Sequence, residues 1–220
     1  NGNWSCPLVV RVPVGGYIHG SLYHSQSIDG YFAHTPGLKI AYPSNASDAK
    51  GLLKYACRCD DPVLFFEHKG MYRQGFASSE EPNEDYLLSF GKAKVVQEGN
   101  DLTIVTWGAI VQKSIEAARN TGKSVEIIDI RTLNPLDMDT ILSSIKKTNR
   151  VIVAHEDHLT SGFGSEIAAR IADAGFEFLD APVKRIASKD VHIAYSPILE
   201  NEILVQTSWI EKEIEEVLSY

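Results

Sequence analysis

The sequence predicts an α/β fold built on mostly parallel sheets, and three observations support this prediction. Short apolar runs rich in β-branched residues recur along the chain, as in strands buried within a parallel sheet. Stretches with apolar residues at helical spacing lie between them, and the order strand, helix, strand indicates a βαβ unit. A charged, aperiodic stretch, residues 69–99, separates two such regions and is interpreted as an exposed linker.

The first region, residues 1–68, predicts three strands, a polar loop and one helix. The strands are the apolar runs at 7–12, 38–42 and 63–66. Ser44 or Asn45 is placed to cap the helix. The apolar positions of that helix share one face: Ala49, Leu52, Leu53 and Ala56. All three strands are too apolar for the exposed edge of a small sheet, so we expect partner strands for them elsewhere.

The second region, residues 100–220, predicts a complete α/β domain. Its strands are expected at 102–106, 125–128 and 151–154. Its helices are expected around 111–118, 138–145, 167–171 and 210–217. Ser208 and Glu211 have the spacing of a capping box for the last of these helices. Strands that alternate with helices predict a mostly parallel sheet covered on both faces.

Composition excludes several classes of function. A formal net charge of −8 over 220 residues argues against binding to nucleic acid, which needs concentrated Lys and Arg. No apolar stretch approaches the length that spans a membrane. The three cysteines, Cys6, Cys57 and Cys59, match neither a disulfide framework nor a zinc ribbon, which favours reduced thiols in a cytosolic or organelle-matrix protein.

A polar, turn-rich segment after the first strand is the best candidate for chemistry. Two glycines, Gly15 and Gly16, open it, and His24 lies within the run Leu22-Tyr23-His24-Ser25-Gln26-Ser27. Such a segment is not core, because its backbone groups need partners or water. It is interpreted as a loop that presents side chains at the mouth of a sheet. Histidine is suited to carry protons there, since its ordinary pKa lies near neutrality.

The order of the motifs resembles the β subunit of thiamine-diphosphate-dependent 2-oxo acid dehydrogenases, most closely the branched-chain (2-oxoisovalerate) type. The motifs that carry the resemblance are Tyr23-His24-Ser25-Gln26-Ser27, Phe32-Ala33-His34-x-Pro36-Gly37, Arg131-Thr132-Leu133-x-Pro135 and His155-Glu156. The resemblance covers nearly the whole chain. It implies a transketolase-like fold, with the second half of a pyrimidine-binding domain at 1–68, a linker at 69–99 and a transketolase C-terminal-type domain at 100–220.

The resemblance also implies a function and its partners. The complete enzyme would decarboxylate a 2-oxo acid on thiamine diphosphate with magnesium and pass the acyl group to lipoamide. It would need an α subunit or fused α region, a second β chain and a lipoyl acyltransferase core. The location would be bacterial cytoplasm or mitochondrial matrix. The family's essential glutamate has no match in this chain, so we expect this fragment to be inactive alone and to bind no cofactor.

Carried onto this sequence, the resemblance assigns the catalytic histidine to His24. Four residues are candidates for substrate contact or for support of the loop and its rim: Ser25, Gln26, His34 and Arg73. A monovalent cation such as potassium, held mainly by backbone carbonyls, is expected at a site built from Leu8, Val9, Ala56, Cys59 and Asp61. The run His155-Glu156-Asp157-His158 could suggest a metal, but a strand-end loop at a subunit interface is the favoured interpretation.

Two alternatives stay open. One is another transketolase-like enzyme, such as a pyruvate dehydrogenase β subunit or deoxyxylulose-phosphate synthase, although the His-Ser-Gln-Ser form favours the dehydrogenases. The other belongs to a different class: a non-catalytic module for subunit assembly and for docking to the acyltransferase. Sequence alone does not choose between 2-oxo acids, because substrate pockets draw on several segments and a partner.

Overall fold

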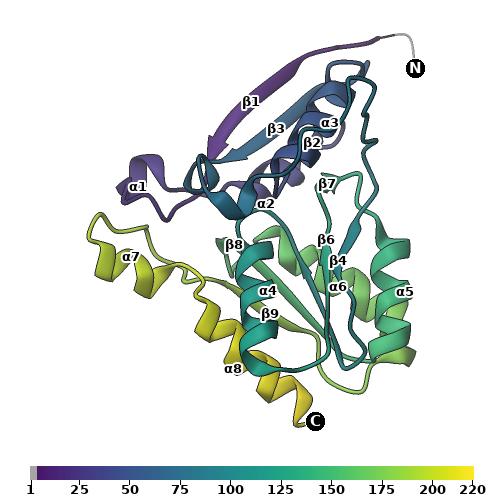
Figure 1. Ribbon diagram of the computed structural model, residues 1–220, viewed down its shortest axis with the longest axis vertical. Coiled ribbons are helices and arrows are strands. Elements are labelled where there is room, and N and C mark those ends of the chain that lie inside the picture. The colour runs from purple at the N-terminus through teal and green to yellow at the C-terminus, as the bar shows by residue number, and fades with distance from the viewer. Residues whose placement is uncertain (1–3) are drawn as a thin grey trace.

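The computed structural model describes residues 4–220, which form two sheets with flanking helices (Figure 1). The first sheet has four strands in the order β1-β3-β2-β7, and the second has five in the order β4-β6-β5-β8-β9. This α/β architecture with mostly parallel strands confirms the predicted fold class.

The first sheet contains the three predicted strands and one that the sequence did not predict. The predicted strands are β1 (Val9–Val14), β2 (Lys39–Ala41) and β3 (Val63–His68), and β3 pairs in parallel with both neighbours. The fourth, β7 (Thr132–Asn134), lies far along the chain, in the second predicted region, and pairs antiparallel with β2. One strand of the first sheet therefore comes from the second half of the chain.

Helix α3 (Ala46–Ala56) covers one face of this sheet and begins as predicted. Asn45 is its N-cap residue, and the Asn45 side chain accepts a hydrogen bond from the Asp48 backbone N–H. Leu52 and Ala56 are buried against Phe65 of β3. The spacing of apolar residues thus correctly predicted the helix and its buried face.

The second sheet contains the remaining strands. These are β4 (Lys94–Gln97), β5 (Leu102–Thr106), β6 (Val125–Asp129), β8 (Val151–His158) and β9 (Lys184–Ser188). β5 pairs in parallel with β6 and β8, and β9 pairs in parallel with β8. β4 pairs antiparallel at the edge and lies inside the stretch interpreted from sequence as a linker. None of the four residues of β4 is fully buried, so they form no apolar run from which the sequence could predict a strand.

Two pairs of helices cover the second sheet on opposite faces. Helices α4 (Ile110–Thr121) and α8 (Thr207–Leu218) pack on one face, and α5 (Met138–Thr148) and α6 (Phe163–Gly175) on the other. The predicted capping box of the last helix is wrong. Gln206 is the N-cap, in an extended conformation, and no side chain caps the helix, so Ser208 already lies within the first turn.

Short helices complete the chain. They are α1 (Ser21–His24), α2 (Asp29–Ala33) and α7 (Pro197–Ile203), with the 3₁₀ turns η1 (Lys69–Met71), η2 (Gly75–Ala77) and η3 (Phe176–Phe178). Among residues 4–220, no helix has the length and apolar character needed to cross a membrane.

One apolar core joins the two sheets. Ile40 and Phe66, from the face of the first sheet opposite α3, belong to the same buried cluster as Val105 and Ile128 of the second sheet. Tyr42 packs edge-on against Phe66, with ring centroids 5.7 Å apart. Burial of this much apolar surface between the sheets fixes the first sheet against the second.

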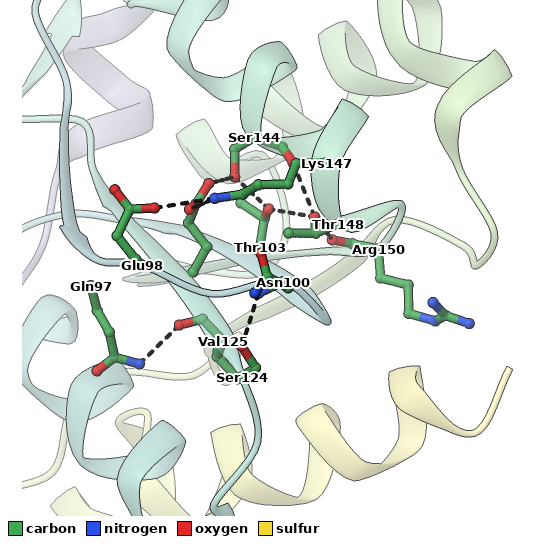
Figure 2. Close-up of polar contacts among 11 residues, drawn as sticks. Gln97, Glu98, Asn100, Thr103, Ser124, Val125, Ser144, Lys147, Thr148 and Arg150 are labelled. Atoms are coloured by element: carbon green, nitrogen blue, oxygen red, sulfur yellow. Dashed lines mark hydrogen bonds and ion pairs between the residues drawn. The ribbon is translucent and has the colours of Figure 1, made fainter.

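A buried polar network attaches α5 to the second sheet (Figure 2). Thr103 Oγ1 lies 2.6 Å from Ser144 Oγ and 2.7 Å from Thr148 Oγ1. Ser144 and Lys147 both donate to the Glu126 carboxylate. Thr103 and Glu126 lie near the amino ends of their strands, whereas ligands of open α/β sheets bind at the carboxyl ends. We therefore assign this network to stability.

Candidate functional site

The loop that follows the carboxyl end of β1 carries the predicted catalytic histidine. Residues 15–27 leave the strand and return to it, because the Gly15 N–H donates to the Gln26 carbonyl at 2.9 Å. His24 is the last residue of α1, and its side chain is exposed. The Lys69 ammonium donates to the His24 carbonyl oxygen. The loop therefore closes at its base and presents His24 to solvent.

The two residues after His24 bond within the loop. Ser25 is fully buried, and its hydroxyl accepts a hydrogen bond from the Gly20 N–H at 3.0 Å. The Gln26 side chain donates to the Leu22 carbonyl at 3.0 Å. In this structure both side chains are placed to support the loop.

The backbone of the loop is strained. Tyr17, His19 and Ser21 have φ angles of 59°, 56° and 58°, in the left-handed region that residues with a side chain seldom adopt. Such conformations persist only when the surroundings impose them, and they are common at functional sites. The loop is therefore held in shape by contacts outside itself.

Glu156, at the end of β8, supplies one set of these contacts. Its Oε1 accepts hydrogen bonds from the Gly16 N–H at 2.6 Å and from the Ser27 hydroxyl at 3.2 Å. Its Oε2 lies 2.6 Å from His68 Nε2, at the end of β3. Burial alone would raise the pKa of Glu156, but the His68 imidazole and these donors hold it below its ordinary value.

A second set of contacts comes from the C-terminal part of the chain. The buried carboxylate of Glu200, on α7, accepts from the His19 N–H at 3.1 Å and lies 2.7 Å from His19 Nδ1. The Tyr17 hydroxyl donates to the Val205 carbonyl at 2.8 Å. In Figure 1, α7 (yellow) lies on the same side of the molecule as α1.

The side chains of the run from His155 to His158 turn to separate partners. His155 stacks on Trp107, with ring centroids 5.2 Å apart, and burial lowers the pKa of its imidazole to about 3. Asp157 accepts from the Gly30 N–H at 3.0 Å, and His158 Nδ1 lies 3.0 Å from the Lys189 carbonyl. Across residues 4–220, no three His, Cys, Asp or Glu residues are grouped to hold a metal ion.

The first residue of α2, Asp29, carries a buried carboxyl group. Asp29 accepts a hydrogen bond from the Trp107 indole N–H at 2.6 Å, and its other carboxyl oxygen is buried with no hydrogen-bond partner among residues 4–220. Burial first, and then the nearby Asp157, raise the pKa of Asp29 well above its ordinary value. The bond from Trp107 holds Asp29 within the core at the start of α2.

The other two candidates lie at separate cavities. His34 follows α2, is exposed, and lines a cavity of about 1260 Å³ that the loop after β8 also lines. Arg73 lines a cavity of about 470 Å³ beside α3 and has a left-handed φ of 67°. His24 lines neither cavity. The structure therefore does not bring His24, His34 and Arg73 together.

The end of β3 carries a glutamate that is fully engaged near Arg73. Glu67 accepts from Arg11 Nη2 at 2.9 Å and from the Tyr72 hydroxyl at 2.6 Å. The hydrogen bond from Arg11 is the main reason that the pKa of Glu67 is lowered. Burial, together with the bond to Glu67, raises the pKa of Tyr72 to about 12.

Comparison with known proteins decides the family. The model of the transketolase C-terminal domain matches residues 91–210, and that of the transketolase pyrimidine binding domain matches residues 1–74. Over 224 aligned residues the chain is 44% identical to the 2-oxoisovalerate dehydrogenase subunit beta of Bacillus subtilis, covering all of this chain and 68% of that protein. The chain belongs to the β-subunit family of 2-oxo acid dehydrogenases.

Other relatives of this β-subunit chain include both substrate types. It is 45% identical to the mitochondrial 2-oxoisovalerate dehydrogenase subunit beta of Dictyostelium discoideum, over 86% of this chain and 52% of that protein. It is 42% identical to the pyruvate dehydrogenase E1 component subunit beta of Bacillus subtilis, over 89% of this chain and 60% of that protein. A solved structure described as "Split gene transketolase, inactive beta4 tetramer" shares the fold, with a TM-score of 0.75. The match covers 96% of this chain and 65% of that one, at 21% sequence identity.

The predicted cation site of this β-subunit chain has its main groups engaged within the chain. The Leu8 carbonyl accepts from the Val63 N–H at 2.8 Å, and the Ala56 carbonyl accepts from the Cys59 N–H at 3.1 Å. Asp61 lies 2.9 Å from the Lys39 ammonium, and burial raises the pKa of the Cys59 thiol. Val9 forms the first pair of β1 with β3. Potassium at this site stays a prediction.

Sequence reasoning missed the two carboxylates that hold the loop. Glu156 lies in a motif that carried the family resemblance, so its position was noted but not its contacts. Glu200 carried no signal, because a glutamate on a short helix is normally solvated. Its complete burial, which only the structure reveals, distinguishes it.

Proposed function

We propose that this chain forms the histidine-bearing part of a 2-oxo acid dehydrogenase that decarboxylates a branched-chain 2-oxo acid and transfers the acyl group to lipoamide. The observation that carries the proposal is the presentation of His24 on a closed, strained loop, in a chain of this family. The chain spans between about half and two thirds of the curated relatives named above, so this proposal concerns the complete enzyme.

The function requires thiamine diphosphate, with magnesium, which supplies the decarboxylation chemistry when it is bound. Three carboxylates near the loop are already engaged: Glu67 with Arg11 and Tyr72, Glu156 with the loop and His68, and Glu200 with His19. None of the three is free to bond the pyrimidine ring, so we derive no step through the cofactor.

The role proposed for His24 is to hold or deliver a proton beside the substrate. An imidazole can both accept and donate a proton, and a fixed loop keeps it in one place. Ser25 and Gln26 support this role through their hydrogen bonds within the loop. The partners proposed are an α subunit or fused α region, a second β chain and a lipoyl acyltransferase core, in bacterial cytoplasm or mitochondrial matrix.

The test compares histidine variants of the complete enzyme assembled with this chain. We expect His24→Ala to lower kcat for lipoamide acylation by about 10²–10⁴-fold, the usual contribution of a positioned acid or base. His192→Ala, at another exposed histidine, is the matched control and should retain activity. Full activity of His24→Ala would contradict the proposal.

Substrate choice is measured with the same preparation. A higher kcat/KM for 3-methyl-2-oxobutanoate than for pyruvate supports the branched-chain assignment. The similarity to a pyruvate dehydrogenase subunit makes pyruvate the specific alternative, and the reverse ranking would establish it.

A further inference from the structure

The loop that carries His24 is held mainly by residues of the second sheet and its helices. Three of its residues keep left-handed backbone conformations, at Tyr17, His19 and Ser21. Two of these three, Tyr17 and His19, are bonded to the segment 200–205. The start and end of the loop, at Gly16 and Ser27, are bonded to Glu156. The second half of the chain therefore imposes the shape that the loop would not adopt alone.

Glu156 acts at the base of the loop. A single carboxylate oxygen accepts from both Gly16 and Ser27, so it fixes the distance between the two ends. The second oxygen contacts His68 at the carboxyl end of β3. Because the side chain is 4% exposed, water cannot replace these bonds. One group thus connects β8, β3 and both ends of the loop.

Glu200 acts at the middle of the loop. Its side chain is completely buried, whereas that of His19 is 49% exposed. It contacts both the backbone N–H and the imidazole of His19. His19 lies five residues before His24, on the stretch that leads into α1. A buried carboxylate at this point fixes the backbone just before α1.

We propose that Glu156 and Glu200 are positioning residues for His24, an inference that rests on the proposed function. Neither touches the reacting atoms. Each fixes one part of the loop that carries the exposed His24. Small displacements of a catalytic group cost large factors in rate, so these remote contacts act on kcat more than on substrate binding.

The experiment uses Glu156→Gln and Glu200→Gln in the complete enzyme, with Glu202→Gln as the matched control. Glu202 is also on α7, but it is 71% exposed, and its ion pair with Lys189 is long, at 3.6 Å. We expect kcat to fall by about 10–100-fold in each test variant, with KM changed less than about threefold. The control should behave as the parent enzyme.

Double variants separate a positioning role from a structural one. If Glu156 acts through His24, then His24→Ala with Glu156→Gln should be no slower than His24→Ala alone. Losses that multiply would overturn the inference while leaving the proposed function intact. An active His24→Ala would instead refute the proposed function.

Hydrogen–deuterium exchange gives a readout independent of activity. Amides 15–27 should exchange at least about tenfold faster in both test variants than in Glu202→Gln, because the strained loop loses its restraint. Unchanged exchange would overturn the inference. If Glu156→Gln fails to fold, Ser27→Ala removes one of the loop contacts of Glu156 and carries the same expectations.

Discussion

The ion pair between Asp48 and Arg131 provides the sharpest test of how the two halves of the chain are held together. Asp48 lies on α3, and Arg131 lies just after β6. Arg131 Nε and Nη2 donate to the two Asp48 oxygens, each at 2.8 Å, and the side chains are 9% and 2% exposed. The perturbation is Asp48→Asn, which removes the charge and keeps the size of the side chain.

The expected loss follows from the burial of the pair. Removing one partner leaves a buried guanidinium without its counter-charge, which costs about 3–5 kcal/mol. In a chain of this size, each kcal/mol shifts the melting temperature by about 2–4 °C, so the melting temperature should fall by about 6–20 °C. This loss is much larger than that of an exposed pair, which is about 0–1 kcal/mol.

The assay is urea unfolding followed by circular dichroism, with thermal melting as a second measure. Glu166→Gln is the matched control, because it removes the charge from an exposed carboxylate–arginine ion pair. In that pair the side chains of Glu166 and Arg170 are each 52% exposed. Arg131→Met combined with Asp48→Asn removes both charges. This double variant should regain part of the loss, since no lone charge stays buried.

Two results would refute this reasoning. The first is a loss for Asp48→Asn no larger than that for Glu166→Gln, which would mean that water reaches Arg131. The second is a double variant as unstable as the sum of its single variants, which would mean that the two groups act independently.

Two further predictions concern the interior. Burial raises the pKa of Asp129 from 3.8 to about 6, so its contribution to stability is present below pH 3.8 and is lost as pH rises through about 6. The free energy of unfolding of Asp129→Asn, measured with urea, should therefore gain about 3 kcal/mol relative to that of the parent as pH rises from 4 to 7. Plots of this free energy against pH that run parallel for the two proteins would contradict the prediction. Gly164→Ala should cost about 1–3 kcal/mol, because the new Cβ would lie 2.2 Å from His155 Cδ2, whose ring is stacked on Trp107. Gly75→Ala, with open space around it, is the control, and equal melting temperatures would disprove the clash.

Local patterns were sufficient to predict most of the fold. The face of α3 and its cap at Asn45 follow from residues within one helical segment, and the structure has both. The polar segment around His24 was correctly placed as a loop at a strand end, because a run with so few apolar residues cannot be core. The spacing of Ser208 and Glu211 led to a wrong prediction of the cap. A cap depends on backbone conformation, and the residue with the conformation of an N-cap is Gln206.

Long-range contacts could not be predicted in this way. β7 has three residues, and its pairing with β2 depends on how the two sheets meet. Glu156 and Glu200 reach the His24 loop across 140 and 181 residues of chain, from Gly16 and His19. No local spacing encodes such partners. The separate locations of His34 and Arg73 were equally invisible before the fold was known.

The strand that crosses between the halves has a consequence for cutting the chain. Strand β7 (Thr132–Asn134) completes the first sheet although it lies in the second half of the chain. A single cut in the sequence therefore cannot separate the two sheets. A protease that nicks the surface stretch 78–85 should leave two pieces that stay associated through β7 and the common core. Expression of the N-terminal piece alone would instead bare the edge of β2, and this piece would be prone to aggregate.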